Sequence, residues 1–402
     1  MNWLKNEKVK HAFMIGLLCS VSYLAVYFAR NILSTVTPQM LEGKGYSTEY
    51  IGSVSSAFFI FYAVGQLING IIGDKMKARY MISFGLILAG VCNLAFPFMT
   101  PSSLSALVVY GLTGFFLSMI YGPMTKVVAE NTEPVYATRC SLGYTFASFF
   151  GSPLAGLVAS FLAWRSVFTV SSVALFVMGT VCFLIFLYFE KKGIVKYNQY
   201  QREQKKGGSI KVLIQHRIIK FTLISILTGV IRTTVVFWLP TYISQYLRFS
   251  SEQAASVFTA ATLVISLTTF IAVFLYERLH HNMDVTILIG FSFSAVSFLL
   301  VFLVKQPVLN IIFMVLAIMA NNTAATMLWS RYCPSLRDTG MVSGATGFLD
   351  FVSYASAAIS SSLFANAVAD IGWNPLILIW FGLMVVGVMV SLPRKKEMKS
   401  SR

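Results

Sequence analysis

Two arginines lie inside stretches that are otherwise apolar and long enough to cross a lipid bilayer. Arg30 belongs to the stretch 13–37, and Arg232 belongs to the stretch 221–246, about two hundred residues later. A permanent positive charge in hydrocarbon costs ~2.5–3.5 kcal/mol on insertion scales, so it is tolerated where it faces a water-filled cavity or a partner. The guanidinium stays protonated, and its planar fork can bind a phosphate or carboxylate through two parallel hydrogen bonds. The sequence therefore predicts that Arg30 and Arg232 are functional residues that face a cavity or a partner.

The surroundings of the two arginines repeat along the chain. Pro38 follows Arg30 by eight residues, and Pro240 follows Arg232 by eight. Beyond each proline a short polar turn precedes a new apolar stretch, and the two turns are Tyr46-Ser47-Thr48-Glu49 and Phe249-Ser250-Ser251-Glu252. This pattern indicates two like halves, each beginning with a helix that carries one buried arginine.

The composition is that of a membrane protein. Hydrophobic residues make up 56% of the chain and charged residues 11%, whereas an average soluble domain has about 25% charged residues. A bilayer requires ~20 apolar residues per helix. Twelve stretches meet this requirement: 13–37, 50–73, 79–99, 103–127, 138–162, 166–189, 217–245, 252–275, 284–304, 307–330, 340–366 and 373–392. The predicted fold class is an all-α membrane protein with twelve transmembrane helices in two pseudo-symmetric halves of six.

Loop composition predicts the division of the chain and its orientation. The polar segment 190–215 is expected to be a linker between an N-terminal half, 1–189, and a C-terminal half, 216–402. Basic residues concentrate at both termini, in this linker and in the loop after the second stretch, while the alternate loops hold only Lys44, Arg165, Arg248 and Lys305. By the positive-inside rule both termini are cytoplasmic. We expect a multi-pass protein of the plasma (inner) membrane.

Several other classes of protein are disfavoured. The net charge of +16 does not indicate nucleic-acid binding, because the bases lie almost wholly in short loops between apolar stretches. The five cysteines and four histidines show no metal-ligand spacing, so neither a metal nor a cofactor is expected. An enzyme would need a catalytic set such as HExxH, and a channel would not need matched arginines. The expected partners are a small anion, with inorganic phosphate or a proton, and the lipid bilayer around a monomer.

A cytoplasmic turn follows the second stretch and contains one acid among bases. It includes Asp74 and ends at Arg79, and Glu277 with Arg278 occupies the matching place in the second half. Acids at helix ends can form ion pairs with bases across the turn, which would hold helices together on one side of the membrane. The alternative is a basic loop that only fixes the orientation.

The two halves and the Gly73-Asp74 turn resemble the major facilitator superfamily along the whole chain. Arg232 with Trp238, Pro240 and Tyr242 resembles the seventh helix of the organophosphate:phosphate antiporters, which exchange glycerol phosphate or hexose phosphate for inorganic phosphate. Further motifs similar to that family are Tyr27-x-x-Arg30, Tyr62 and Gly122-Pro123-x-x-Lys126. The resemblance implies an alternating-access transporter with a site between its halves, in which both arginines bind the anionic group of the substrate.

Further candidate residues follow from the resemblance. Asn321 and Asn322 fall in a helix that lines the cavity in this superfamily, where an amide either binds substrate or bonds to another helix. Lys126 lies at a cytoplasmic helix end and either contributes to the site or extends to the interface. The aromatic candidates either line the cavity or face lipid; they are Tyr27, Tyr62, Trp238 and Tyr242.

The chain departs from the family in its auxiliary basic residues. Asn31 stands where the family often has lysine, Gln66 replaces a second lysine, and the stretch 143–150 lacks the family's histidine. Asp350 is the only acid deep inside a predicted span. It could pair with Arg232, carry a proton, or serve a structural role.

Four functions are compared on these grounds. The leading hypothesis is a carrier that exchanges a phosphate ester for inorganic phosphate. The second is a proton-coupled symporter of an organic carboxylate or sugar acid that uses Asp350. A proton-driven exporter of hydrophobic compounds fits two buried arginines less well, and a nutrient receptor built on the transporter fold stays open.

Overall fold

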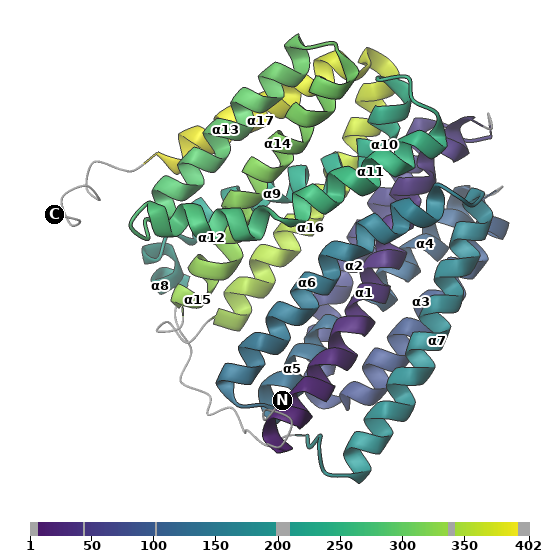
Figure 1. Ribbon diagram of the computed structural model, residues 1–402, viewed down its shortest axis with the longest axis vertical. Coiled ribbons are helices and arrows are strands. Elements are labelled where there is room, and N and C mark those ends of the chain that lie inside the picture. Colours follow the sequence, from purple (N-terminus) through teal and green to yellow (C-terminus); the bar gives the residue numbers. More distant parts are fainter. Residues whose placement is uncertain (1–6, 43–44, 101–102, 198–209, 337–341, 393–402) are drawn as a thin grey trace. The chain divides into compact units, whose positions relative to one another are not determined.

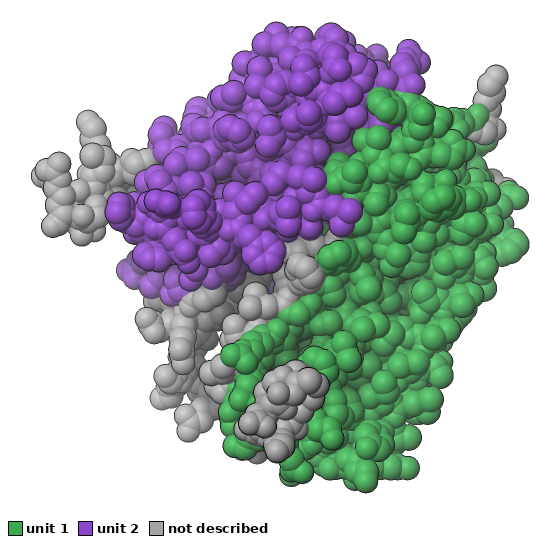
Figure 2. Space-filling view, in the orientation of Figure 1, with its two compact units in different colours: residues 1–203, 249–262 green, residues 204–248, 263–402 purple. Residues whose placement is uncertain are grey.

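The chain folds into helices that run side by side in bundles (Figure 1). The computed structural model describes residues 7–42, 45–100, 103–197, 210–336 and 342–392. No strand occurs in these ranges. Contacts divide the chain into two compact units: unit 1 contains residues 1–203 and 249–262, and unit 2 contains residues 204–248 and 263–402 (Figure 2).

Unit 1 contains the long helices of the first part of the chain. Their starts follow local sequence signals: the Ser47 hydroxyl caps α2 by accepting from the Tyr50 amide, and Pro134 occupies the first turn of α6. The helices are α1 (Glu7–Glu42), α2 (Thr48–Lys75), α3 (Ala78–Met99), α4 (Ser103–Leu117), α5 (Tyr121–Asn131), α6 (Pro134–Ala159) and α7 (Trp164–Lys191).

Unit 2 contains most of the remaining helices and two wide, π-helical turns. Its elements are α8 (Ile210–Gln215), α9 (Ile218–Gly229), the π-turn η2 (Val230–Val235), α10 (Val236–Gln245), α12 (Thr268–Arg278), α13 (Met283–Leu303), α14 (Pro307–Met327), the π-turn η3 (Leu328–Tyr332), α15 (Cys333–Ser335), α16 (Val342–Ile371) and α17 (Trp373–Ser391). Helix α11 (Ser251–Ser266) begins in unit 1, where the Thr259 hydroxyl donates to the Pro153 carbonyl at 3.3 Å, and ends in unit 2.

These helices match the twelve predicted stretches, and the predicted fold class is confirmed. Among the described residues, eleven helical runs have the length and hydropathy of a membrane span. The one remaining predicted stretch, 138–162, corresponds to α6, which has 26 residues. Four predicted stretches contain an internal break or a π-turn: between α4 and α5, between α9 and α10, between α11 and α12, and where α14 meets η3. The linker 190–215 and the two predicted halves stay predictions.

Each unit packs its helices by the same scheme. In unit 1, α1 packs on α6, α3 on α7, α3 on α4, and α2 on α4. In unit 2, the helices at the corresponding chain positions pair in the same way: α9 with α16, α13 with α17, α13 with α14, and α12 with α14. The internal repeat that was predicted from two arginines and two prolines is therefore also a repeat of helix packing.

Glycines bring the arginine-bearing helices close to their neighbours. A Cβ at Gly151 of α6 would lie 2.6 Å from the Tyr27 carbonyl carbon of α1. A Cβ at Gly229 of α9 would lie 2.7 Å from the Ser353 carbonyl oxygen of α16. Small residues permit such close approach between helices in membranes. In both units the approach occurs one turn before the arginine.

Candidate functional site

Arg30 lies among three aromatic rings of unit 1, which we call the aromatic cage (Tyr27, Phe59 and Tyr62). Its guanidinium carbon is 5.3 Å from the Tyr27 ring centroid, 5.3 Å from that of Tyr62 and 5.8 Å from that of Phe59. A cation within ~6 Å of a ring face is stabilised by ~0.5–2 kcal/mol, depending on desolvation. The cage therefore stabilises the charge of Arg30.

The cage is positioned by the spacing of its residues on two helices. Tyr27 lies three residues before Arg30 on α1, and Phe59 lies three residues before Tyr62 on α2, so each pair shares one helix face. Phe59 is 4% exposed and Tyr62 is 2% exposed, which fixes both rings. Sequence reasoning identified Tyr27 and Tyr62 but not Phe59, because one phenylalanine in an apolar helix carries no distinguishing signal.

A cluster of tyrosines extends from the cage across unit 1. The Tyr23 ring centroid is 4.9 Å from that of Tyr27, 5.5 Å from that of Tyr121 and 6.0 Å from that of Tyr144. These rings join α1, α5 and α6. Tyr144 belongs to the stretch 143–150, which lacks the histidine of the resembled family. Tyrosine rings therefore pack against α1 in the region where that family has a further basic residue.

Lys126 lies against the end of α2. Its ammonium donates to the Gly73 carbonyl at 3.4 Å, and a Cβ at Gly73 would lie 3.3 Å from the Pro123 ring. Two sequence motifs that are far apart in the chain, the turn at Gly73 and Gly122-Pro123-x-x-Lys126, are therefore packed together. The side chain of Asp74 lies outside the described residues.

Arg232 occupies the π-turn η2 in unit 2, between α9 and α10. Its side chain is half-buried, and it forms no ion pair within the described part of unit 2. A π-turn accommodates one extra residue in a helix and is frequent at functional sites. The turn follows directly after the close approach of Gly229 to α16.

Three buried polar atoms near η2 along the chain and in space have no protein partner among the described residues. They are Trp238 Nε1, Asn321 Oδ1 and Asn322 Oδ1. Asn321 is fully buried, and its amide donates to the Thr228 carbonyl, just before η2, at 3.5 Å. An unsatisfied buried polar group costs ~1–3 kcal/mol, so these atoms are suited to bind a polar ligand or water.

Tyr242 and Asp350 lie in other surroundings within unit 2. The Tyr242 hydroxyl donates to Asn310 Oδ1, and its ring is 5.2 Å from that of Trp373. Asp350 is half-buried on α16, next to Leu349, whose carbonyl accepts from the Ser225 hydroxyl of α9 at 2.7 Å. Asp350 thus lies on the helix that packs against the helix preceding Arg232. The substrate role of Tyr242 and the coupling role of Asp350 stay predictions.

Arg79 forms an ion pair with a residue that sequence reasoning did not single out. Its guanidinium donates to Glu190 at 2.9 Å and to the Tyr80 hydroxyl at 2.7 Å, joining the start of α3 to the end of α7. The Tyr197 hydroxyl donates to the other Glu190 oxygen at 2.9 Å. The signal that could have found Glu190 is its place as the single acid at the end of a long apolar run.

A second group of charges ties helix ends in unit 2. Asp284 at the start of α13 accepts from Arg217 and from Lys220, each at 3.0 Å, and Lys220 also donates to the Ser391 carbonyl at the end of α17 at 3.3 Å. Glu277, the predicted acid of this half, is exposed, and its gating role stays a prediction. Each unit therefore ties its third and sixth helices together at one end, though with different residues.

The sequence was compared with known protein families. The family profile described as Major Facilitator Superfamily matches residues 19–361. The chain belongs to the major facilitator superfamily. This is a family of membrane transporters and not of enzymes, as predicted.

The relatives of this superfamily member support its resemblance to the organophosphate:phosphate antiporters. It is 24% identical to a glycerol-3-phosphate transporter of Bacillus subtilis over 62% of this chain and 60% of that protein. It is 23% identical to a phosphoglycerate transporter protein of Salmonella typhimurium over 91% of this chain and 86% of that protein. A probable hexose phosphate transport protein of Chlamydia trachomatis is 21% identical over 41% of this chain and 35% of that protein. The chain thus spans between a third and two thirds of several of the relatives it matches.

Solved structures show the same fold. A D-xylose-proton symporter has a TM-score of 0.75 with 12% sequence identity, covering 94% of this chain and 97% of that chain. A bacterial homolog of the human lysosomal transporter Spinster has a TM-score of 0.72 with 13% identity, covering 95% of each chain. At these identities the likeness concerns the fold of the superfamily alone.

Proposed function

We propose that this protein is a secondary active transporter that exchanges a small phosphate ester for inorganic phosphate by alternating access. Each unit contributes one arginine to the binding of the anion, Arg30 from unit 1 and Arg232 from unit 2. The observation that carries the proposal is the aromatic cage, which stabilises the Arg30 charge within an apolar helix.

A phosphate group suits these two residues chemically. Arginine remains charged in proteins and binds phosphate oxygens bidentately, so two arginines match the charge of a phosphate dianion. The unpartnered Asn321, Asn322 and Trp238 atoms can bind the polar remainder of the ligand. Relatives named as transporters of glycerol-3-phosphate and phosphoglycerate support this substrate class.

We further propose that the protein is a monomer in the plasma (inner) membrane with both termini in the cytoplasm. The support is the distribution of lysine and arginine, which favours the termini, the segment 190–215 and the turn at Lys75 and Lys77. Cysteine labelling with a membrane-impermeant reagent at introduced Arg165→Cys tests the orientation. Labelling from outside intact cells supports it, and labelling only after permeabilisation contradicts it.

The test of transport is uptake of labelled glycerol phosphate into proteoliposomes, with and without internal inorganic phosphate and without a pH gradient. Saturable uptake that requires internal phosphate is expected. Uptake that proceeds equally well in phosphate-free vesicles would contradict exchange. The matched controls are empty vesicles and protein carrying Arg165→Gln, which removes an exposed arginine outside the proposed site.

The second function is proton-coupled symport of an organic carboxylate or sugar acid. It is favoured by one observation: Asp350, a half-buried acid, lies on the helix packed against the helix that precedes Arg232. Under this function an inward proton gradient drives uptake of the organic acid. Asp350→Asn abolishes this gradient-driven uptake, while exchange of substrate at equal pH on both sides continues. If an inward proton gradient drives no uptake of an organic acid by the unmodified protein, this second function is excluded.

A further inference from the structure

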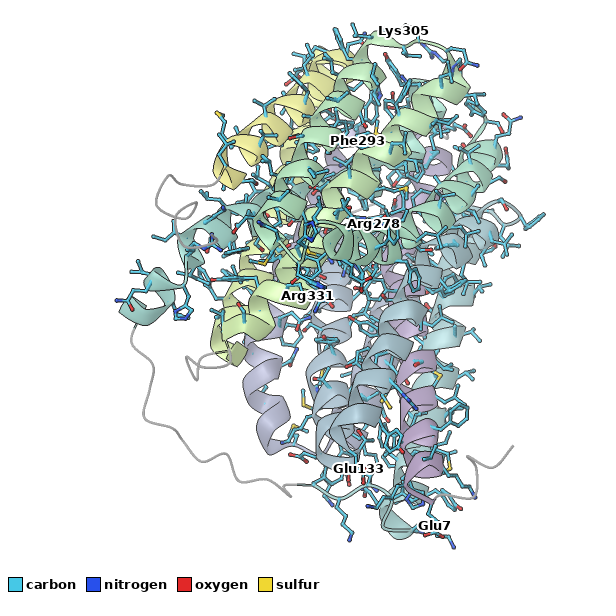
Figure 3. All side chains as sticks on the ribbon, turned by 60° about the vertical axis from the view of Figure 1, so that its left-hand side comes forward. Glu7, Glu133, Arg278, Phe293, Lys305 and Arg331 are labelled. Atoms are coloured by element: carbon cyan, nitrogen blue, oxygen red, sulfur yellow. The ribbon has the colours of Figure 1, made fainter. Side chains whose placement is uncertain are left out.

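Unit 2 has a pocket with a strong positive charge at the end of its helices away from Arg278 and Arg331. It has a volume of about 380 Å³, and we call it the basic pocket; it is lined by Tyr246, Leu247, Arg248, Lys305, Pro307 and Asn374. Figure 3 shows Lys305 at one end of the unit, with Arg278 and Arg331 toward the other. By the positive-inside prediction this end is extracytoplasmic, where the chain has few basic residues.

The Lys305 ammonium is held in place by neutral groups. It donates to the Tyr246 hydroxyl at 2.8 Å and to Asn374 Oδ1 at 2.8 Å, while the Tyr246 hydroxyl donates to the same Asn374 oxygen at 2.7 Å. The Phe302 ring centroid is 5.2 Å from the ammonium. These contacts orient the ammonium but leave its full positive charge, because none of the partners is an acid.

Arg248 adds a second cation to the same pocket. Its backbone has a φ of 66°, in the left-handed region that residues other than glycine and asparagine rarely adopt. Its side chain is exposed, and no ion pair of Arg248 occurs within the described part of the chain. The six lining residues therefore carry two positive charges and no negative charge.

Two helix starts add to the positive potential. Pro307 is the first residue of α14, and Asn374 is the second residue of α17. The first turn of a helix carries a partial positive charge on its amide groups. Gly372 precedes α17 and provides no side-chain cap, so the amides of that first turn are not satisfied by a capping side chain.

We propose that the basic pocket binds a phosphate group. The Lys305 ammonium supplies a positive charge and a third N–H donor, since its hydrogen bonds to Tyr246 and Asn374 use two. Arg248 supplies a planar guanidinium, and the start of α17 supplies backbone amide donors. Together they match the several oxygens and the negative charge of a phosphate. The phosphate belongs either to a soluble phosphate compound outside the cell or to a lipid headgroup, and both present the same chemistry. The inference is independent of the proposed exchange, because it concerns binding at one end of unit 2.

Binding of labelled inorganic phosphate to the full chain, in a detergent that contains no phosphate, tests the soluble source. Arg30→Gln serves as the background in every protein, so that the proposed transport site does not contribute. Adding Lys305→Gln is expected to weaken phosphate binding by about tenfold, the effect of one charged hydrogen bond. Adding Arg165→Gln, which removes an exposed basic residue of unit 1, is the matched control and leaves binding unchanged.

Retention of phosphatidylglycerol on the same proteins, measured by native mass spectrometry, tests the lipid source. Arg248→Asn is the second variant, because asparagine tolerates the left-handed backbone and the arginine forms no ion pair with the described residues, so folding is preserved. Loss of phosphate binding in both pocket variants assigns a soluble ligand, and loss of lipid retention alone assigns a headgroup. If both variants behave as Arg165→Gln does in both measurements, the proposal is wrong, whatever the outcome of the exchange assay.

Discussion

Arg79 and Glu190 are 111 residues apart in the chain, yet the guanidinium donates to the carboxylate at 2.9 Å. The Arg79 side chain is 9% exposed and that of Glu190 is 16% exposed, so the pair is shielded from solvent. The Arg79 guanidinium also lies 4.6 Å from the Tyr80 ring centroid and 5.2 Å from that of Phe183. The pair therefore connects α3 and α7 at a point where the membrane span ends.

We expect Glu190→Gln to destabilise unit 1 by about 3 kcal/mol, because removing one partner of a buried pair leaves the other charge uncompensated. Thermal unfolding of the purified protein in detergent measures the effect. Glu133→Gln is the control, since Glu133 pairs with Lys8 at an exposed position where both side chains are more than half exposed (Figure 3). Equal melting temperatures for the two variants would contradict the role given to Glu190.

Replacing Arg30 or Arg232 by lysine is expected to lower transport by at least about tenfold while leaving membrane insertion intact. Lysine keeps the charge, but it loses the planar fork at both positions and, at position 30, the contact of the guanidinium with the aromatic cage. Uptake into proteoliposomes, corrected for the amount of inserted protein, measures the loss. Arg165→Lys is the control. Normal transport by both Arg30→Lys and Arg232→Lys would refute bidentate binding of the anion by the two guanidinium groups.

Alkaline pH is expected to weaken the segment that follows α7. Burial, and then the hydrogen bond to Glu190, raise the pKa of Tyr197 above its ordinary value of about 10. Below that ordinary pKa the phenol is neutral in folded and unfolded chains, so its contribution is complete; it is lost as the pH rises toward the raised pKa. Thermal unfolding should therefore show a difference between the natural protein and Tyr197→Phe at pH 7 that shrinks above pH ~10. A difference that stays constant over this range would contradict the shift.

Gly151→Ala is expected to destabilise unit 1 and impair transport, because its Cβ would lie 2.6 Å from the Tyr27 backbone and would push α6 away from α1. Gly382→Ala on α17 is the control. Nothing lies within 4 Å of a Cβ there, so alanine should stabilise that helix by roughly 0.5–1 kcal/mol. Thermal unfolding and uptake measure both variants, and a harmless Gly151→Ala would show that the two helices separate at little cost.

The membrane fold could be predicted from the sequence, because hydrophobic length is a local signal, whereas the binding role of Arg30 and Arg232 stays a prediction. The partner of Arg79 could not be predicted. The only acids that sequence reasoning considered at helix ends were Asp74, in the same turn, and the acid at the matching place in the second half, whereas Arg79 pairs with Glu190 at the end of another helix. Pairing across 111 residues depends on tertiary packing, which no local pattern encodes.

Breaks within helices were also beyond sequence reasoning. The span 251–278 is interrupted at Leu267, where neither proline nor glycine occurs. The Ser266 hydroxyl donates to the Leu263 carbonyl at 2.6 Å, and the Thr268 hydroxyl donates to the Ile265 carbonyl at 2.6 Å. Such bonds from hydroxyls to the preceding turn compete with the regular helical bonds, so the interruption arises from two residues that are ordinary in helices.

The π-turn at Arg232 has a consequence for how this helix tolerates insertions and deletions. A π-turn holds one residue more than the regular helix, and each residue of an α-helix advances the direction of its side chain by about 100°. Deleting one residue from 230–235 would restore a regular helix, and Trp238 would keep its direction relative to Thr228, because the wide turn takes up the extra residue within one helical turn. A single-residue deletion at this turn would therefore leave Trp238 on its face of the helix, whereas the same deletion in the regular helix α9 would turn Trp238 by about 100° relative to the start of that helix.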